Sequence, residues 1–405
     1  MMFLGLIIIC VLLVVPDFYI WHAFLRGHCA WYGQLLHWLP TLSVAVALAV
    51  SLLGTRSIFV LELIIFVLLC FALPKVAFSL LALLRLPKVG LFIALLLAAA
   101  MVYGYVGGWK HLVTKNVTVH LADRLPAAFK GYRIAQISDL HIGTFKNDTA
   151  HVRRIVESVN ALHPDLIVFT GDLVNFSPDE IKPFQDILSR LSAPDGVVAI
   201  LGNHDYCLYA PDHSPAASRA NTEAVCRIEK EMGWHLLRNE SLAISRPINP
   251  PSTDGAAMIG GETAPSANTG TVNGAVTAQS APPALLHIIG VENIGKPPFP
   301  SRGDLGKALA GVPTEAFKIL LSHDPSHWRR EVIGHPSTID LTLSGHTHAM
   351  QLSILGLSPS RLFFKEWGGH YREGSRHLFV CTGTGGNVPF RLGAWPQISL
   401  ITLDH

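Results

Sequence analysis

Hydrophobic residues are distributed in two different ways along the chain, and the change comes near residue 109. Before that point, long apolar stretches follow one another with few charged residues between them; they cover residues 3–25, 35–53, 58–84 and 91–106. A helix needs about 20 mostly apolar residues to cross the hydrocarbon core of a bilayer. We therefore predict an all-α transmembrane region of about four helices within residues 1–110.

Two other interpretations of this first region fit its sequence less well. A cleaved signal peptide would need a positively charged start and a small-residue cleavage site, and neither accompanies the first apolar stretch. Core helices of a soluble domain would not require four such stretches in succession. Pro16 with Asp17 and Pro74 with Lys75 interrupt the first and third stretches, which leaves the helix count open. Basic residues are balanced between alternate loops, so the side that the rest of the chain faces is open too.

After Trp109, short apolar segments alternate with segments of helical character. Strands are predicted at residues 132–138, 165–170, 196–201, 317–322, 339–344, 377–382 and 397–403, and helices at 148–162, 178–191 and 222–232. Asp148 is the expected cap of the first of these helices. Such alternation is typical of a layered α/β domain with a buried sheet, which we place at residues 111–405.

One stretch inside this second region has a different composition. Residues 246–284 are rich in Pro, Gly, Ser, Thr and Ala and contain few large apolar residues, so they cannot bury a core. We predict a flexible surface insertion between strands at residues 234–245 and 284–292. A functional lid is the alternative.

Charge and cysteine content narrow the function classes. The formal net charge is +2 in 405 residues, and the chain has no basic stripe with interleaved aromatic residues, so nucleic acid is not an expected partner. The six cysteines include no CxxC pair, and Cys207 and Cys226 could form a disulfide or remain free thiols. The cysteines therefore indicate no compartment.

Polar clusters directly follow five of the predicted strands. They are Asp139-x-His141, Gly171-Asp172, Asn203-His204-Asp205, His323-Asp324, and the pair His346 and His348. Taken singly, these residues have the ordinary alternative of a cap or a turn. Ligand sites of α/β sheets, however, lie beyond the carboxyl ends of the strands. Imidazole, carboxylate and amide side chains at five strand ends together indicate a site for divalent metal ions.

The pattern suits two metal ions. In hydrolytic two-metal sites the ions lie about 3.5–4 Å apart, and one carboxylate can bridge them. Asp172 suits the bridging position because the glycine before it permits close approach. His346 and His348 are expected to point the same way along an extended segment and to bind neighbouring ions.

The ordered motifs DLH, GDLV, GNHD, SHD and GHTH resemble those of the calcineurin-like metallophosphoesterase superfamily, from about Tyr132 to the C-terminus. The resemblance implies a four-layer α/β fold, a β-sandwich flanked by helices, with two divalent cations at its edge; Mn, Fe and Zn all suit the ligands. It implies Asp139, His141, Asp172 and His348 as ligands of the first metal, and Asp172, Asn203, His323 and His346 as ligands of the second. His204 would stabilise the transition state or protonate the leaving group, and Asp205 would orient its ring through the other nitrogen.

The closing segment GTGGNVPFRLGAWPQISLITL and the apolar front end resemble the membrane-associated bacterial branch of that superfamily. This resemblance implies a multi-pass protein of the bacterial inner membrane. The expected function is two-metal hydrolysis of a phosphomonoester, phosphodiester or pyrophosphate bond in a phosphorylated small molecule or lipid. The alternatives are hydrolysis of a soluble nucleotide or phosphodiester, and a non-catalytic membrane receptor or scaffold. Arg391 in the closing segment could contact a substrate phosphate or form a structural salt bridge.

Overall fold

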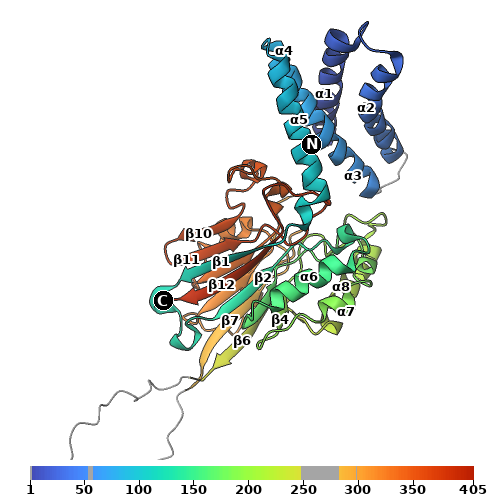
Figure 1. The fold of residues 1–405 in the computed structure, drawn as a ribbon. Coiled ribbons are helices and arrows are strands. Elements are labelled where there is room, and N and C mark those ends of the chain that lie inside the picture. Colours follow the sequence, from blue (N-terminus) through green and yellow to red (C-terminus); the bar gives the residue numbers. More distant parts are fainter. Residues whose placement is uncertain (1, 53–57, 248–281, 298) are drawn as a thin grey trace, which may run out of the picture.

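The N-terminal part of the chain is helical (Figure 1). The computed structural model describes residues 2–52, 58–247, 282–297 and 299–405. Its first helices are α1 (Met2–Ile20), α2 (Trp31–Leu52), α3 (Ile58–Val67), α4 (Leu73–Leu83) and α5 (Pro87–Val106). A π-helical turn, Leu68–Ala72, joins α3 directly to α4, so the helix continues through Pro74.

Within the described residues of this part, four helical stretches are long and apolar enough to cross a membrane: Ile7–Leu25, Trp31–Ser51, Glu62–Leu83 and Pro87–Lys110. Many of their large apolar side chains are exposed on the outside of the bundle, including Phe92 at 69% and Val106 at 71%. Helices that are apolar all round are suited to lipid surroundings. The prediction of four spanning helices is confirmed at the level of length and composition.

After the helical bundle, the described part of the chain forms two six-stranded sheets that pack face to face (Figure 1). The first has the order β1-β12-β2-β3-β4-β5, and the second has the order β10-β11-β9-β8-β7-β6. The first sheet contains β1 (Val113–His120), β12 (Gln397–Asp404), β2 (Arg133–Ile137), β3 (Leu166–Phe169), β4 (Val197–Ala199) and β5 (His235–Leu236). The second contains β10 (Gly369–Glu373), β11 (Arg376–Val380), β9 (Leu341–Ser344), β8 (Lys318–Leu321), β7 (Ala284–Gly290) and β6 (Glu240–Arg246). Strands β2 to β5 are parallel to one another, as are β7, β8, β9 and β11.

Apolar residues fill three spaces between these layers. Successive residues of a strand face opposite sides of its sheet. Leu166 and Val168 of β3 therefore pack between the sheets, whereas Ile167 and Phe169 pack beneath helices. The helices are α6 (Thr149–Asn160), α7 (Gln185–Leu188) and α8 (Pro215–Glu231) on the first sheet, and α9 (Leu305–Ala308) with the π-helical turn Trp328–Val332 on the second. The predicted four-layer α/β fold is confirmed.

Two expectations about individual elements need correction or cannot be followed. The helix expected at residues 178–191 is reduced to a 3₁₀ turn, Pro178–Glu180, and the short α7, since Pro183 has no backbone N–H and disrupts a helix interior. The expected insertion at 246–284 lies largely outside the described residues. Its flanks are described: Arg246 of β6 pairs with Ala284 of β7.

The bundle meets the α/β layers at the end of α5. A shared apolar cluster contains Cys70, Met101, Val388 and Phe390, with Tyr105 beside it. A Cβ atom added at Gly104 would lie 2.4 Å from the Phe390 ring, so this contact requires glycine in α5. Glu62 of α3 makes a second contact, because its Oε2 lies 3.5 Å from Nζ of Lys146.

Candidate metal centre

The seven side chains predicted as metal ligands follow the ends of five strands. Asp139 and His141 follow β2, Asp172 follows β3, Asn203 follows β4, His323 follows β8, and His346 and His348 follow β9. All seven are buried. Parallel strands end at the same edge of their sheet, so these loops converge at one edge of the sandwich.

The structure brings these side chains together in two overlapping sets. The first set is Asp139, His141, Asp172 and His348, and the second is Asp172, His323 and His346. Within each set the potential ligand atoms all lie within 4.8 Å of one another. Asp172 belongs to both sets, and a carboxylate with two oxygens can serve two neighbouring cations.

Atoms of the cluster that lack ordinary partners fit bound cations. Asn203 donates from Nδ2 to the Tyr209 hydroxyl at 3.1 Å, but its buried Oδ1 has no hydrogen-bond partner among the described residues. A buried oxygen of this kind is costly unless something satisfies it. The Nε2 atoms of His141 and His348 lie 3.1 Å apart, so their lone pairs repel unless a proton or a cation lies between them. Imidazole, carboxylate and amide ligands are a set that divalent transition metals accept.

Strained backbone accompanies the cluster. Positive φ angles occur at Asp139 (54°), His141 (45°), Asp172 (61°), His346 (74°) and His348 (50°). Residues with a Cβ rarely adopt this region, and each costs of the order of 1–3 kcal/mol where it occurs. The expectation that His346 and His348 lie along an extended segment is therefore wrong. Both reach the cluster from left-handed backbone, and they enter different sets.

Glycines in the motifs permit the close approach of the loops. A Cβ atom at Gly202 would lie 2.2 Å from Oδ1 of Asp172, and one at Gly345 would lie 2.3 Å from Oδ2 of Asp139. Gly171 has a φ of 93°, and a Cβ there would lie 2.5 Å from the backbone nitrogen of Gly202. Larger residues at these positions would push the carboxylates out of place.

Burial and charge act in opposite directions on the acids and imidazoles of the cluster. Burial lowers the pKa of His323, but Asp172, whose Oδ2 lies 3.1 Å from Nε2, and Asp139 outweigh it and raise that pKa to about 10. Burial opposes ionisation of Asp172, yet His323 and His204 hold its pKa well below the usual value. Burial raises the pKa of Asp139 to about 7. A cation bound here would compete with a proton on His323, so metal binding would be coupled to proton release.

His204 and Asp205 lie beside the cluster, but they do not form the expected pair. Nδ1 of His204 lies 2.8 Å from the backbone oxygen of Asn175, which is its ring partner. The Asp205 carboxylate instead accepts hydrogen bonds from the backbone N–H groups of residues 172, 173, 174 and 202, at 2.8 to 3.2 Å. The prediction that Asp205 orients the His204 ring is wrong. Asp205 ties the loop after β3 to the loop after β4.

Arg391 is buried and binds backbone carbonyls. Its guanidinium donates to the oxygen of Gly385 at 2.9 and 2.5 Å and to that of Ala394 at 2.8 Å. Burial lowers its pKa to about 10. The backbone N–H of Gly385 in turn donates to the backbone oxygen of Asp139 at 3.0 Å. Arg391 is 1% exposed, so it supports the glycine-rich turn beside Asp139 rather than contacting a phosphate.

Four residues around the cluster were not predicted. Tyr209 accepts the hydrogen bond from Asn203, and the backbone oxygen of Asn175 is the partner of His204. The rings of Phe299 and Phe364 lie 4.6 and 5.3 Å from the ring of His346. Asn175 lies three residues beyond Asp172, so its closeness to that motif was a usable signal. The two phenylalanines have no local signal, because the chain folds them next to His346.

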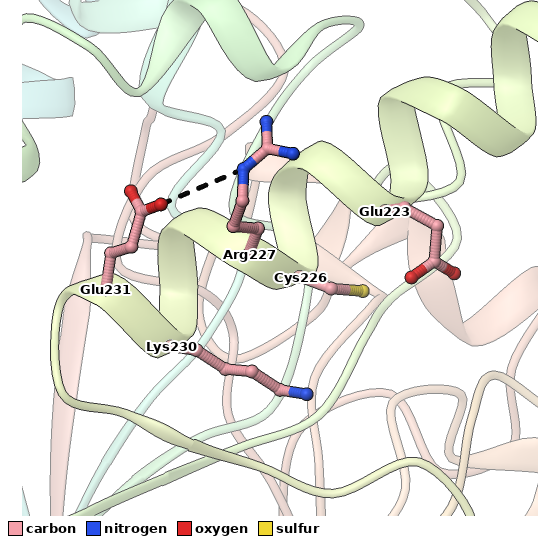
Figure 2. Close-up of a pocket in the computed structure, with 5 residues that line it drawn as sticks. All are labelled: Glu223, Cys226, Arg227, Lys230 and Glu231. Atoms are coloured by element: carbon pink, nitrogen blue, oxygen red, sulfur yellow. Dashed lines mark ion pairs between the residues drawn. The ribbon is translucent and has the colours of Figure 1, made fainter.

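A surface cavity of about 360 Å³ lies elsewhere, on α8 (Figure 2). Its lining residues are Glu223, Cys226, Arg227, Lys230 and Glu231. Arg227 and Glu231 form an ion pair at 3.8 Å, and both side chains are more than half exposed. None of the candidate ligands lines this cavity, so we assign it no chemistry.

Comparison with known proteins identifies the family to which the chain belongs. The calcineurin-like phosphoesterase family matches residues 132–350. A "Transmembrane protein with metallophosphoesterase domain" from Danio rerio is 28% identical over 321 residues, which is 77% of this chain and 62% of that protein. The metallophosphoesterase YkuE of Bacillus subtilis is 26% identical, with 74% of this chain and 89% of YkuE covered.

A third relative is the "UDP-2,3-diacylglucosamine pyrophosphatase LpxG" of Chlamydia trachomatis. It is 28% identical over 320 residues, covering 72% of this chain and 91% of that protein. The family match extends over more than half of the chain and contains all the candidate ligands. The chain therefore belongs to the calcineurin-like phosphoesterase family, a family of phosphoric-ester hydrolases, and its N-terminal helices are apolar and of membrane-spanning length.

Proposed function

We propose that the protein is a membrane-anchored hydrolase that cleaves a phosphoester or pyrophosphate bond with the help of two divalent cations. The observation that carries the proposal is the position of Asp172 in both ligand sets. The ligands would be Asp139, His141, Asp172 and His348 for one cation, and Asp172, Asn203, His323 and His346 for the other. Residues 1–110 would anchor the catalytic domain, residues 111–405, in the membrane.

When bound, the cations would supply Lewis acidity towards the phosphoryl oxygens and towards water. The protein itself fixes the bridging carboxylate. Oδ1 of Asp172 accepts the backbone N–H of His204 at 2.8 Å, and Asp205 holds the backbone on either side. Because these bonds are in place before substrate arrives, the carboxylate needs no rearrangement during the reaction.

His204 is suited to deliver a proton to the leaving oxygen. A carbonyl oxygen can only accept, so the contact with Asn175 means that Nδ1 of His204 carries a proton and donates it. Nε2 is then the atom that gains and loses a proton. The His204 side chain is partly exposed, unlike the ligands around it, so it can reach a substrate. Proton delivery of this kind contributes typically about 10²–10⁴-fold to a rate.

A lipid-linked phosphate is the substrate class that we propose, in the bacterial inner membrane. The relative named for UDP-2,3-diacylglucosamine supports this choice, as do four helices of membrane-spanning length. A soluble nucleotide or phosphodiester is the alternative. Purified protein would be tested with lipid-linked pyrophosphates, nucleotides and phosphodiesters in parallel. Preference for the soluble compounds would overturn the lipid assignment and leave the hydrolase assignment intact.

The metal assignment is tested with Asp172→Ala. We expect this variant to lose bound metal and turnover together, because both ligand sets lose their shared member. Elemental analysis of the purified protein and hydrolysis of an aryl phosphodiester with added Mn²⁺ measure the two effects. Asp186→Ala, at an exposed aspartate of α7, is the matched control and should behave as wild type. Wild-type turnover by Asp172→Ala would refute the site.

A further inference from the structure

Exposed apolar side chains outside the helical bundle are concentrated in one segment. Of the described residues beyond α5, seven large apolar side chains are exposed, and six of them lie within residues 350–363. They are Met350 (50%), Ile354 (53%), Leu355 (98%), Leu357 (58%), Leu362 (83%) and Phe363 (66%). We call residues 350–363 the apolar loop. Exposed apolar side chains gathered in one segment of a soluble surface mark a candidate interaction site.

The exposure of the apolar loop is built into its conformation. Ser358 donates from Oγ to the oxygen of Ala349 at 2.6 Å. Ile354 and Leu357 exchange backbone hydrogen bonds of 2.9 Å around a tight turn. The two residues at the tip, Leu355 and Gly356, have φ angles of 50° and 77°. Turns with positive φ at both central residues favour Asn-Gly or Asp-Gly, so an almost fully exposed leucine there is costly in water.

The apolar loop is attached to the point where α5 leaves the bundle. Ser353 donates its N–H to the oxygen of Leu392 at 2.9 Å, and Leu392 packs on the cluster that contains Phe390. The neighbouring Arg391 donates its N–H to the oxygen of Gly104 in the last turn of α5, at 3.2 Å. In Figure 1 this part of the chain, coloured orange to red, lies beside the lower end of α5, on the side of the sheets that faces the bundle. The loop is therefore held next to the end of the last apolar helix.

The charge of the segment fits a phospholipid surface. Arg361 and Lys365 are exposed, and residues 350–365 contain no aspartate or glutamate. Apolar side chains flanked by basic ones are the composition of segments that lie in the interface of a membrane, with the cations at the level of the headgroups. Anionic lipids attract basic residues that lie near the membrane surface.

We propose that the apolar loop inserts into the boundary between headgroups and acyl chains of the bilayer from which α5 emerges. The loop begins two residues after His348, and the ring of Phe364, the residue that directly follows the loop, lies 5.3 Å from the ring of His346. Insertion would hold the metal centre directly at the lipid surface. This inference goes beyond the proposed hydrolysis and does not depend on it.

A fluorescent probe on the loop tests the inference without any need for turnover. Leu355→Cys would carry an environment-sensitive dye in a Cys10→Ser, Cys29→Ser background, since the remaining cysteines are buried. The full chain, one copy per lipid nanodisc, would be measured with and without phospholipid spin-labelled in the upper acyl chain. We expect blue-shifted emission and strong quenching by the spin label. Glu315→Cys, at a side chain that is 90% exposed and far along the chain from the loop, is the control and should show neither.

Equal quenching of the two probes, or a Leu355 probe in a watery environment, overturns the inference and excludes lipid in favour of another partner or none. A second variant adds Leu355→Asp and Leu362→Asp to a probe placed by Leu357→Cys. Because both substituted side chains are more than 80% exposed, the protein should keep its metal content while quenching falls several-fold. Quenching that survives the two added carboxylates would also count against insertion. Loss of metal in Asp172→Ala with normal loop quenching would separate the two proposals.

Discussion

The ring of His204 bonds to a backbone oxygen and contacts no carboxylate among the described residues, whereas the imidazoles around it contact acids or one another. We predict that His204→Gln keeps bound metal but lowers kcat by about 10²–10⁴-fold, because glutamine cannot deliver a proton to the leaving oxygen. KM should change much less, since the ligands that would bind the phosphoryl group remain. Steady-state kinetics with an aryl phosphodiester and elemental analysis measure both quantities.

The exposed histidine His213 gives the matched control for this prediction. His213→Gln should show wild-type kcat and metal content. An unchanged kcat in His204→Gln would remove the proton-donor role, and lost metal would show that the side chain supports the cation sites instead.

At the scale of residues, the sequence predicts which side chains lie together in the metal centre, but it does not predict their hydrogen-bond partners. The seven candidate ligands could be found because each follows a buried strand, and strand ends converge. The partners of Asp205 could not be found, because a carboxylate can accept from a side chain or from the backbone with equal ease. Its four backbone bonds depend on left-handed turns, including that at Asp172, which no local pattern prescribes.

At the scale of elements, α6 packs against the linker after the bundle through His151. Its ring lies 5.3 Å from that of Trp109 and 5.1 Å from that of Phe145. Burial, together with the charge of Arg154, lowers its pKa from 6.5 to about 4, with Lys110 acting in the same direction and Asp148 opposing. Between about pH 6.5 and pH 4 the unfolded chain therefore binds a proton at His151 that the folded chain does not. Stability from this group is lost as the pH falls from about 6.5 to 4, by about 3 kcal/mol at most.

We predict that His151→Phe makes the melting temperature less dependent on pH between 6.5 and 4, because phenylalanine keeps the aromatic packing and cannot titrate. Thermal unfolding in detergent at several pH values measures this for variant and wild type. The exposed His235 of β5 supplies the control, and His235→Phe should keep the wild-type profile. Parallel profiles for His151→Phe and wild type would contradict the assignment.

Helices and strands could be predicted from the sequence where most of their residues are apolar and buried. Strands β3, β8 and β9 are buried throughout, and a run of apolar residues such as Leu166–Phe169 of β3 is the signal of a central parallel strand. Strand β1 escaped prediction because most of its residues are exposed, and its partner β12 lies at the other end of the chain, with Val113 opposite Gln397. Pairing over that distance leaves no local pattern.

At the scale of the whole molecule, the membrane helices and the metal centre are physically connected. The backbone N–H of Arg391 donates to the oxygen of Gly104 in the last turn of α5, and its guanidinium donates to the oxygen of Gly385. The N–H of Gly385 donates to the backbone oxygen of Asp139. The bundle therefore supports the loops at one edge of the sandwich. The opposite edge is where β6 ends and β7 begins, at the pair Arg246 and Ala284.

That separation leads to a prediction about residues 247–283, which join β6 to β7. Replacing them with a short turn containing Asn-Gly should leave metal content and turnover unchanged, because paired antiparallel strands accept such a turn and the ligands follow strand ends at the other edge. Arg246 must be kept, since its guanidinium binds Asp195 at 3.0 and 2.5 Å. The same closure with Arg246→Ser should melt at a lower temperature. If the shortened protein kept its metal but lost turnover on a lipid-linked substrate alone, residues 247–283 would act on the substrate and the lid interpretation would replace the surface insertion.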